Sequence, residues 1–136
     1  MIRFYAAPMD AVGPLWPLVD HHLRRACERG VGDISAETLR AECEAHRARL
    51  LLACDGPRIL AAAVARFCLQ ADGSTACELV AAGGGSLASW KHVIPDFEAW
   101  ARFHGAKSIR LCGRPGWERV FLGYRRRPLV SLVKDL

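Results

Sequence analysis

The sequence lacks a long uninterrupted run of apolar residues. Its two most apolar stretches, 50–54 and 59–69, are separated by Asp55 and Arg58, and the second is broken by Arg66. Both fall well short of the roughly 20 residues that a membrane-spanning helix needs. The chain also begins without the continuous apolar block of a secretory signal. We therefore expect a cytoplasmic location and no contact with a membrane.

Paired cysteines and metal-ligand clusters are also missing. The six cysteines stand singly, without a Cys-x-x-Cys pair and without a Cys/His cluster at metal-ligand spacing. Such cysteines are typical of buried free thiols in a reducing compartment. His21 and His22 are adjacent in a predicted helix, so their side chains point in different directions. The sequence therefore predicts no metal site.

Low-complexity segments and linkers are absent too. The composition is that of one folded domain over 1–136. Of the 136 residues, 51% are hydrophobic, which is enough for a single core. The net charge is +5, and basic residues gather in the last third of the chain, where they favour anionic partners. No nucleic-acid motif accompanies them, so we expect no specific nucleic-acid partner. If Arg125-Arg126-Arg127 did bind nucleic acid, the affinity would depend strongly on salt concentration.

The spacing of apolar residues and turn signals predicts ten elements. They are a strand at 1–6, helices at 14–29 and 35–47, strands at 49–54, 59–69 and 75–82, a helix at 89–104, a strand at 107–112, a helix at 115–122 and a strand at 128–134. Ser35 is the expected N-cap of the second helix. Pro95 either lies in the first turn of a helix that begins after Ser89, or kinks a longer one. The order is β-α-α-β-β-β-α-β-α-β.

A glycine-rich loop follows the fourth predicted strand, with the sequence Gly83-Gly84-Gly85-Ser86-Leu87-Ala88. Together with the element order, it resembles the Gcn5-related N-acetyltransferase (GNAT) family, which has a Gln/Arg-x-x-Gly-x-Gly/Ala loop here. The resemblance implies an α/β (α+β) fold, with a mixed, mainly antiparallel central sheet and helices on both faces. It also implies acetyl-CoA as the cofactor, with its pyrophosphate held by Gly83, Gly84, Gly85, Ser86 and Ala88. Glycines and a helix N-terminus suit an anion.

The loop departs from the family pattern at two positions. Gly83 stands in place of the Gln/Arg residue, and Ser86 stands in place of the middle glycine. Three consecutive glycines also suit any sharp turn from a strand into a helix. A purely structural turn is therefore the alternative to cofactor binding.

The resemblance implies roles for residues on either side of this loop. Glu78 is the candidate general base, with a solvent-facing strand residue as the alternative, and Leu79 or Val80 would supply a backbone amide to the acetyl group. Arg114 or Arg119 would help to neutralise phosphate. Many relatives carry a catalytic tyrosine five residues before the final aromatic, and counting back from Tyr124 reaches Arg119. A guanidinium stays protonated near neutral pH and cannot act as that acid.

A second resemblance is to GNAT-like proteins encoded by bacteriophages and prophages. It rests on the glycines, Trp90, the segment 98–101 and Gly113-Arg114-x-Gly116-Trp117. Two functional hypotheses follow. The first hypothesis is an acyl-CoA-dependent N-acetyltransferase with an amine acceptor. The second is a catalytically inactive virion component or binding module with phage structural proteins as partners, located in the host cytoplasm or the virion. In either case the final strand, as an edge strand, suits pairing across a homodimer.

Overall fold

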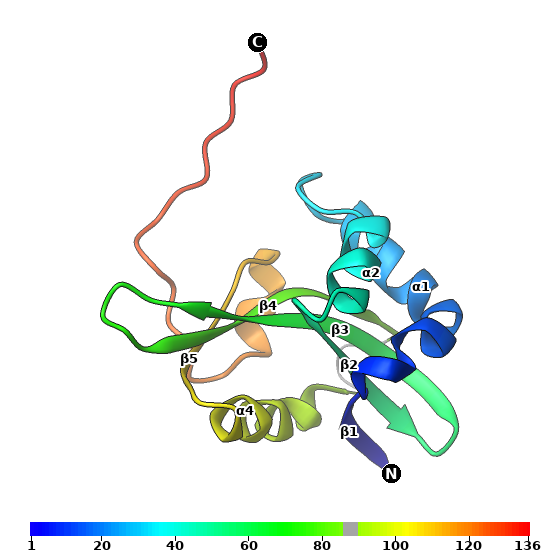
Figure 1. The fold of residues 1–136 in the computed structure, drawn as a ribbon. Helices are drawn as coiled ribbons and strands as arrows, with labels where there is room; N and C mark the ends of the chain where they lie inside the picture. The colour runs from blue at the N-terminus through cyan, green and yellow to red at the C-terminus, as the bar shows by residue number, and fades with distance from the viewer. Residues whose placement is uncertain (86–89) are drawn as a thin grey trace.

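The computed structural model describes residues 1–85 and 90–136, and its centre is one five-stranded sheet in the order β1-β2-β3-β4-β5 (Figure 1). The strands are β1 (Ile2–Ala6), β2 (Arg49–Asp55), β3 (Arg58–Leu69), β4 (Thr75–Gly84) and β5 (Ala106–Leu111). The first three pairings are antiparallel, and β4 pairs with β5 in parallel. The sheet is therefore mixed and mainly antiparallel, as the sequence predicts.

Helices cover both faces of this sheet (Figure 1). On one face α1 (Val12–Glu28) and α2 (Ala36–Glu44) contribute Val19, Leu23 and Leu39 to a core with Leu50 and Leu52 of β2. On the other face α4 (Ile94–Phe103) packs its apolar side onto β3 and β4. Successive leucines of β2 thus point into different layers, which explains why its apolar run is continuous rather than alternating.

The helix starts agree with the local signals in the sequence. The Ser35 side chain accepts a hydrogen bond of 3.2 Å from the Thr38 backbone amide and so caps α2. Pro95 lies in the first turn of α4, directly after the short 3-10 helix η2 (Lys91–Val93), so it does not kink a longer helix. The expected start at Ser89 lies outside the described residues.

The C-terminal segment differs from the sequence-based expectation. The helix expected at 115–122 is a short 3-10 helix, η3 (Pro115–Arg119), and the strand expected at 128–134 is not formed. Residues 125–136 are exposed, and the chain runs away from the sheet towards its C-terminus (Figure 1). A strand needs a neighbour to pair its backbone groups, and within the described residues this segment has none.

The cysteines were expected to be buried free thiols, and no segment was expected to span a membrane. All six cysteines are free thiols. Cys43, Cys54 and Cys77 are buried, whereas Cys27 and Cys68 are half-buried and Cys112 is exposed, which corrects the expectation of six buried thiols. Burial raises the pKa of the Cys43 thiol to about 11, so it stays protonated near neutral pH. Among residues 1–85 and 90–136, no helix has the length and apolar character needed to cross a membrane.

Candidate functional site

The two parallel strands at the edge of the sheet separate part-way along their length. Their pairing runs from Thr75 with Ala106 to Leu79 with Leu111, where β5 ends. β4 continues as far as Gly84. On the side that β5 has left, the described residues provide no strand to pair with Val80–Gly84. The backbone donors and acceptors of this stretch that point away from β3 are therefore available to an extended ligand.

A β-bulge lies at the same point of β4. Val64 of β3 pairs with Ala81, whereas the next residue, Ala65, pairs with Leu79, so Val80 has no partner on β3. A bulge bends its strand and redirects the backbone groups next to it. The structure thus places Val80, one of the two residues predicted to supply a backbone amide, where β4 departs from β5.

The three glycines at the end of β4 occupy different surroundings. A Cβ atom built on Gly83 would lie 2.2 Å from the backbone oxygen of His22 in α1, and one on Gly84 would lie 2.5 Å from Cβ of Ala61 in β3. Packing alone is therefore enough to require glycine at both positions. A Cβ atom on Gly85 would meet nothing within 4 Å, and Gly85 is exposed. Gly85 is thus the described glycine whose surroundings leave room for a ligand.

The remaining two residues of the expected cofactor loop, Ser86 and Ala88, lie outside the described residues. Their assignment to the pyrophosphate stays a prediction.

His22 lies in α1, at the contact with Gly83. Its Nε2 atom is 3.4 Å from the backbone oxygen of Ile59 in β3. Burial and the neighbouring His21 lower the pKa of His22, so the imidazole is neutral at neutral pH. The residue therefore adds a dipole, not a full charge, to the end of β4.

Glu78 lies in β4 with both of its carboxylate oxygens in use. Arg66 of β3 donates from Nε to Oε1 over 2.7 Å, and Arg110 of β5 donates from Nε to Oε2 over 3.2 Å. The carboxylate thereby links three neighbouring strands. Both carboxylate oxygens accept a charge-assisted hydrogen bond, which is stronger than one between neutral groups. The arrangement therefore favours a structural role over abstraction of a proton from a substrate.

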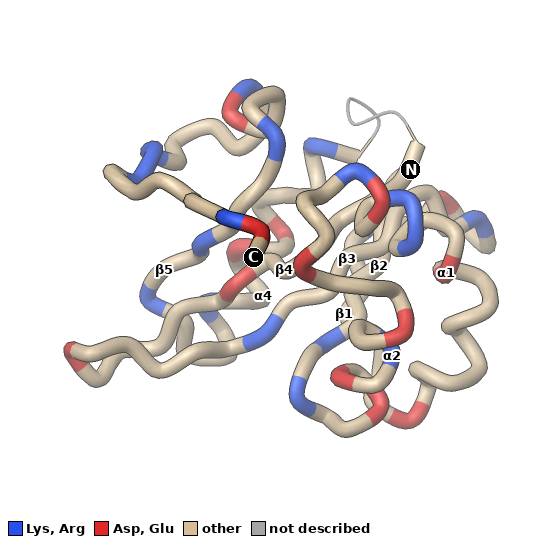
Figure 2. The backbone as a smooth tube through the Cα atoms, turned by 90° about the horizontal axis from the view of Figure 1, so that it is seen from above, with Lys and Arg blue, Asp and Glu red and all other residues tan. Residues whose placement is uncertain are grey.

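Arg114 and Arg119 lie at the two ends of η3, and both are exposed. Neither forms an ion pair with another residue in the described ranges. Figure 2 shows lysine and arginine positions along β5 and the segment that follows it. The segment follows the carboxyl end of β5, where the pairing with β4 ends, so a positive potential there suits an anionic ligand.

Tyr124 has a partner that the sequence did not reveal. Its hydroxyl donates a hydrogen bond of 2.8 Å to Oε2 of Glu98 in α4. Burial and this carboxylate raise the pKa of the Tyr124 hydroxyl. The tyrosine therefore anchors the end of the η3 segment to α4, and its proton is committed to Glu98. No local motif in the sequence pairs these two residues.

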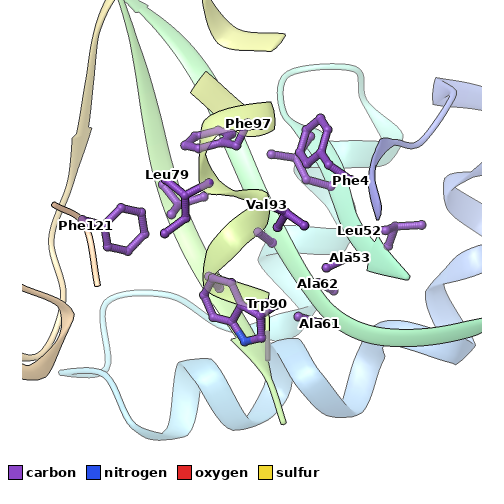
Figure 3. Close-up of a pocket in the computed structure, with 14 residues that line it drawn as sticks. Phe4, Leu52, Ala53, Ala61, Ala62, Leu79, Trp90, Val93, Phe97 and Phe121 are labelled. Carbon is purple, nitrogen blue, oxygen red and sulfur yellow. The ribbon is translucent and has the colours of Figure 1, made fainter. Parts of the chain in front are cut away.

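A small apolar cavity lies between α4 and the sheet (Figure 3). Its volume is about 50 Å³, and its walls include Leu79, Trp90, Phe97 and Phe121. The indole nitrogen of Trp90 is buried and has no hydrogen-bond partner within the described part of the chain. Because Leu79 is the last residue of β4 to pair with β5, the cavity lies at the point where the two strands separate and is apolar there.

Sequence comparison identifies no relative: no protein-family model matches the chain, and no curated protein matches it. Solved structures do match. An aminoglycoside acetyltransferase, meta-AAC0020, from an uncultured soil metagenomic sample in complex with sisomicin is similar with a TM-score of 0.73 and 10% sequence identity, over 99% of this chain and 96% of that one.

Two bacterial structures are similar along the whole chain as well. The ribosomal-protein-alanine N-acetyltransferase from Brucella melitensis biovar Abortus 2308 gives a TM-score of 0.69 at 11% identity, over 100% of this chain and 99% of that one. A predicted acetyltransferase with acetyl-CoA from Clostridium acetobutylicum gives 0.64 at 12% identity, over 98% and 96%. The chain therefore has the GNAT acetyltransferase fold, and the expected fold class is confirmed.

Proposed function

We propose that this chain is an acyl-CoA-dependent N-acetyltransferase that binds acetyl-CoA along the edge of β4 that β5 leaves open. The observation that carries the proposal is the coincidence of the bulge at Val80 with the end of the β4–β5 pairing at Leu79 and Leu111. Proteins with this fold include one solved with acetyl-CoA and others named for acetyl transfer to aminoglycosides or to a ribosomal protein. An amine acceptor follows by analogy of fold.

The described residues fit such a cofactor along its length. The open backbone edge of Val80–Gly84 suits the amides of an extended pantetheine arm, because strand edges recognise extended chains through backbone hydrogen bonds. Gly85 leaves room for phosphate oxygens, and Arg114 supplies positive charge beyond the end of β5. Leu79 and Phe121 offer an apolar wall to a short acyl group.

Acetyl-CoA, when bound, would supply an activated acetyl group for transfer to the amine. The chain's own contribution would be binding and orientation, with the backbone amide of Val80 as a donor to the oxygen on which negative charge develops. Glu78 holds two arginines and Tyr124 holds Glu98. We therefore assign positioning and oxyanion stabilisation to the described residues. The role of Glu78 as the base that would take the proton of the amine, while the CoA thiolate leaves, stays a prediction.

A calorimetric titration with acetyl-CoA tests cofactor binding, with Gly85→Asp as the variant and Gly85→Ala as its matched control. The aspartate places a negative charge in open space beside the phosphates, so Kd should rise at least about tenfold, a loss of about 1.4 kcal/mol. The alanine variant should bind like the wild type. Gly84 is unsuitable for this test because any side chain there would strike Ala61. Equal binding by all three proteins would contradict phosphate binding at Gly85.

A second candidate is a GNAT-shaped binding module without catalysis. It is favoured by Arg119 at the position of the catalytic tyrosine and by the two arginines that occupy Glu78. The resemblance to phage-encoded proteins, with a virion or host-cytoplasm location, belongs to this candidate and stays a prediction. Release of the CoA thiol from acetyl-CoA in the presence of aminoglycosides, polyamines and peptide amines separates the two, because a binding module without catalysis would release none.

A further inference from the structure

Three charged side chains form a row across β3, β4 and β5. Arg66 pairs with Glu78 in the strand register, and Glu78 pairs with Arg110. The neighbouring row belongs to the core beneath α4 and consists of Phe67, Cys77 and Ile109. Because successive residues of a strand point to opposite faces of a sheet, the charged row lies on the face that carries α1 and α2.

The charged row is open to solvent, although the same face is covered farther along β4. At the end of β4, α1 packs so closely that Gly83 has no room for a side chain. At the row, the side chains of Arg66 and Arg110 are 50% and 31% exposed. The hairpin that joins β3 to β4 extends beyond α1 and α2 (Figure 1). A ligand can therefore reach the row from this face.

The row offers positive charge to a ligand. Its two arginines share the single carboxylate of Glu78, which is only 23% exposed, so the exposed charge is positive. Arg110 donates to Glu78 through Nε, and its two terminal nitrogens form no hydrogen bond within the described residues. Two such nitrogens can donate in parallel to the two oxygens of a carboxylate. Glu78 holds both guanidinium groups in place, so the row is prepared for such a ligand.

The row also lies next to the proposed acetyl site. Glu78 precedes Val80 by two residues, which is about 7 Å along a strand. Arg110 directly precedes Leu111, where the pairing of β5 with β4 ends. The opposite face at this level is filled by the core beneath α4. An acceptor that reaches Val80 across the sheet therefore approaches on the side of the charged row.

We propose that the acceptor amine carries a carboxylate, which binds Arg66 and Arg110 while the amine lies beside Val80. This inference rests on the proposed acetyltransferase function and names the class of its acceptor. An acidic amino acid has the complementary charge. Aminoglycosides and polyamines carry several positive charges, and the row disfavours them by like-charge repulsion. Arg66 and Arg110 are thus specificity-determining residues, and Glu78 is the residue that positions them.

Release of the CoA thiol from acetyl-CoA tests this specificity, with L-aspartate and L-glutamate compared with their diamides. The wild type should have a kcat/KM at least about tenfold higher for the dicarboxylates, the effect expected of a hydrogen bond to a charged group. Arg110→Gln and Arg66→Gln should each raise KM for the dicarboxylates and leave kcat/KM for the diamides unchanged. Lys107→Gln removes one positive charge from the same strand as Arg110 and is the matched control, which should keep the preference.

The possible results separate this inference from the proposed function. Equal kcat/KM for dicarboxylates and diamides in the wild type would overturn the inference and leave the acetyltransferase function standing. A preference that persists in both arginine variants, or an equal loss of activity towards acids and diamides, would show that the row does not select the acceptor. No thiol release with any amine would overturn the proposed function and this inference with it.

Discussion

Gly83→Ala is expected to lower the free energy of unfolding by about 3 kcal/mol, at the upper end for an overpacked site. The added Cβ would lie 2.2 Å from the backbone oxygen of His22 and 3.2 Å from Cβ of Ala26. A backbone oxygen in the middle of α1 cannot rotate away, so the helix has to shift off β4. Urea denaturation of the variant and the wild type, followed by circular dichroism, measures the loss.

Gly85→Ala is the control for this effect because its Cβ would enter open space. Its stability should stay within about 0.5 kcal/mol of the wild type, as for most exposed substitutions. If the two alanine variants were equally stable, α1 would not pack on the end of β4 as described. The triplet of glycines would then have no packing explanation.

Trp16→Ala is expected to cost about 3–5 kcal/mol, the range for removing a large buried aromatic side chain. Trp16 is 2% exposed in the core between α1 and the sheet, and its indole nitrogen donates a hydrogen bond of 3.1 Å to Asp20. The substitution leaves a cavity that the surrounding core fills only in part. Thermal unfolding should show a large fall in Tm or a chain that no longer unfolds cooperatively.

Leu18→Ala is the matched control on the same helix, because Leu18 is 57% exposed. It should change stability by a few tenths of a kcal/mol at most, close to the exposed-site range of about 0.5 kcal/mol. A Trp16→Ala variant as stable as Leu18→Ala would contradict the packing of α1 against the sheet.

The elements were predictable where the signal is local. Val19 and Leu23 are four apart on α1 and are both fully buried, as helical periodicity requires. Ser35 caps α2 by bonding a neighbour three residues along. The continuous apolar run of β2 reflects burial on both faces of the sheet. Each of these signals lies within a short stretch of the chain, so it can be recognised from the sequence alone.

The site was harder to predict because its geometry depends on distant parts of the chain. The bulge at Val80 exists only through the register with Val64 and Ala65 on another strand. The need for glycine at position 83 comes from the carbonyl of His22 in α1. No spacing rule joins such residues. The sequence therefore leaves the glycine triplet open between a cofactor loop and a structural turn, whereas the structure shows that two of its members, Gly83 and Gly84, need glycine for packing.

Glu78 and the strand expected at 128–134 illustrate the same limit. The partners of Glu78, Arg66 and Arg110, come from the strands on either side of it, and only the sheet order brings the three together. Residues 128–134 do have the apolar pattern of a strand, but the pattern alone does not specify which edge of a sheet a strand joins.

The central claim, that acetyl-CoA binds along the edge of β4 that β5 leaves open, is tested most directly by hydrogen–deuterium exchange. With saturating acetyl-CoA, the backbone amides of Val80–Gly84 should exchange more slowly, because a ligand would bond to groups that lack a strand partner. Amides of α2 should be unchanged. Unaltered exchange across Val80–Gly84, or protection confined to other segments, would contradict the account.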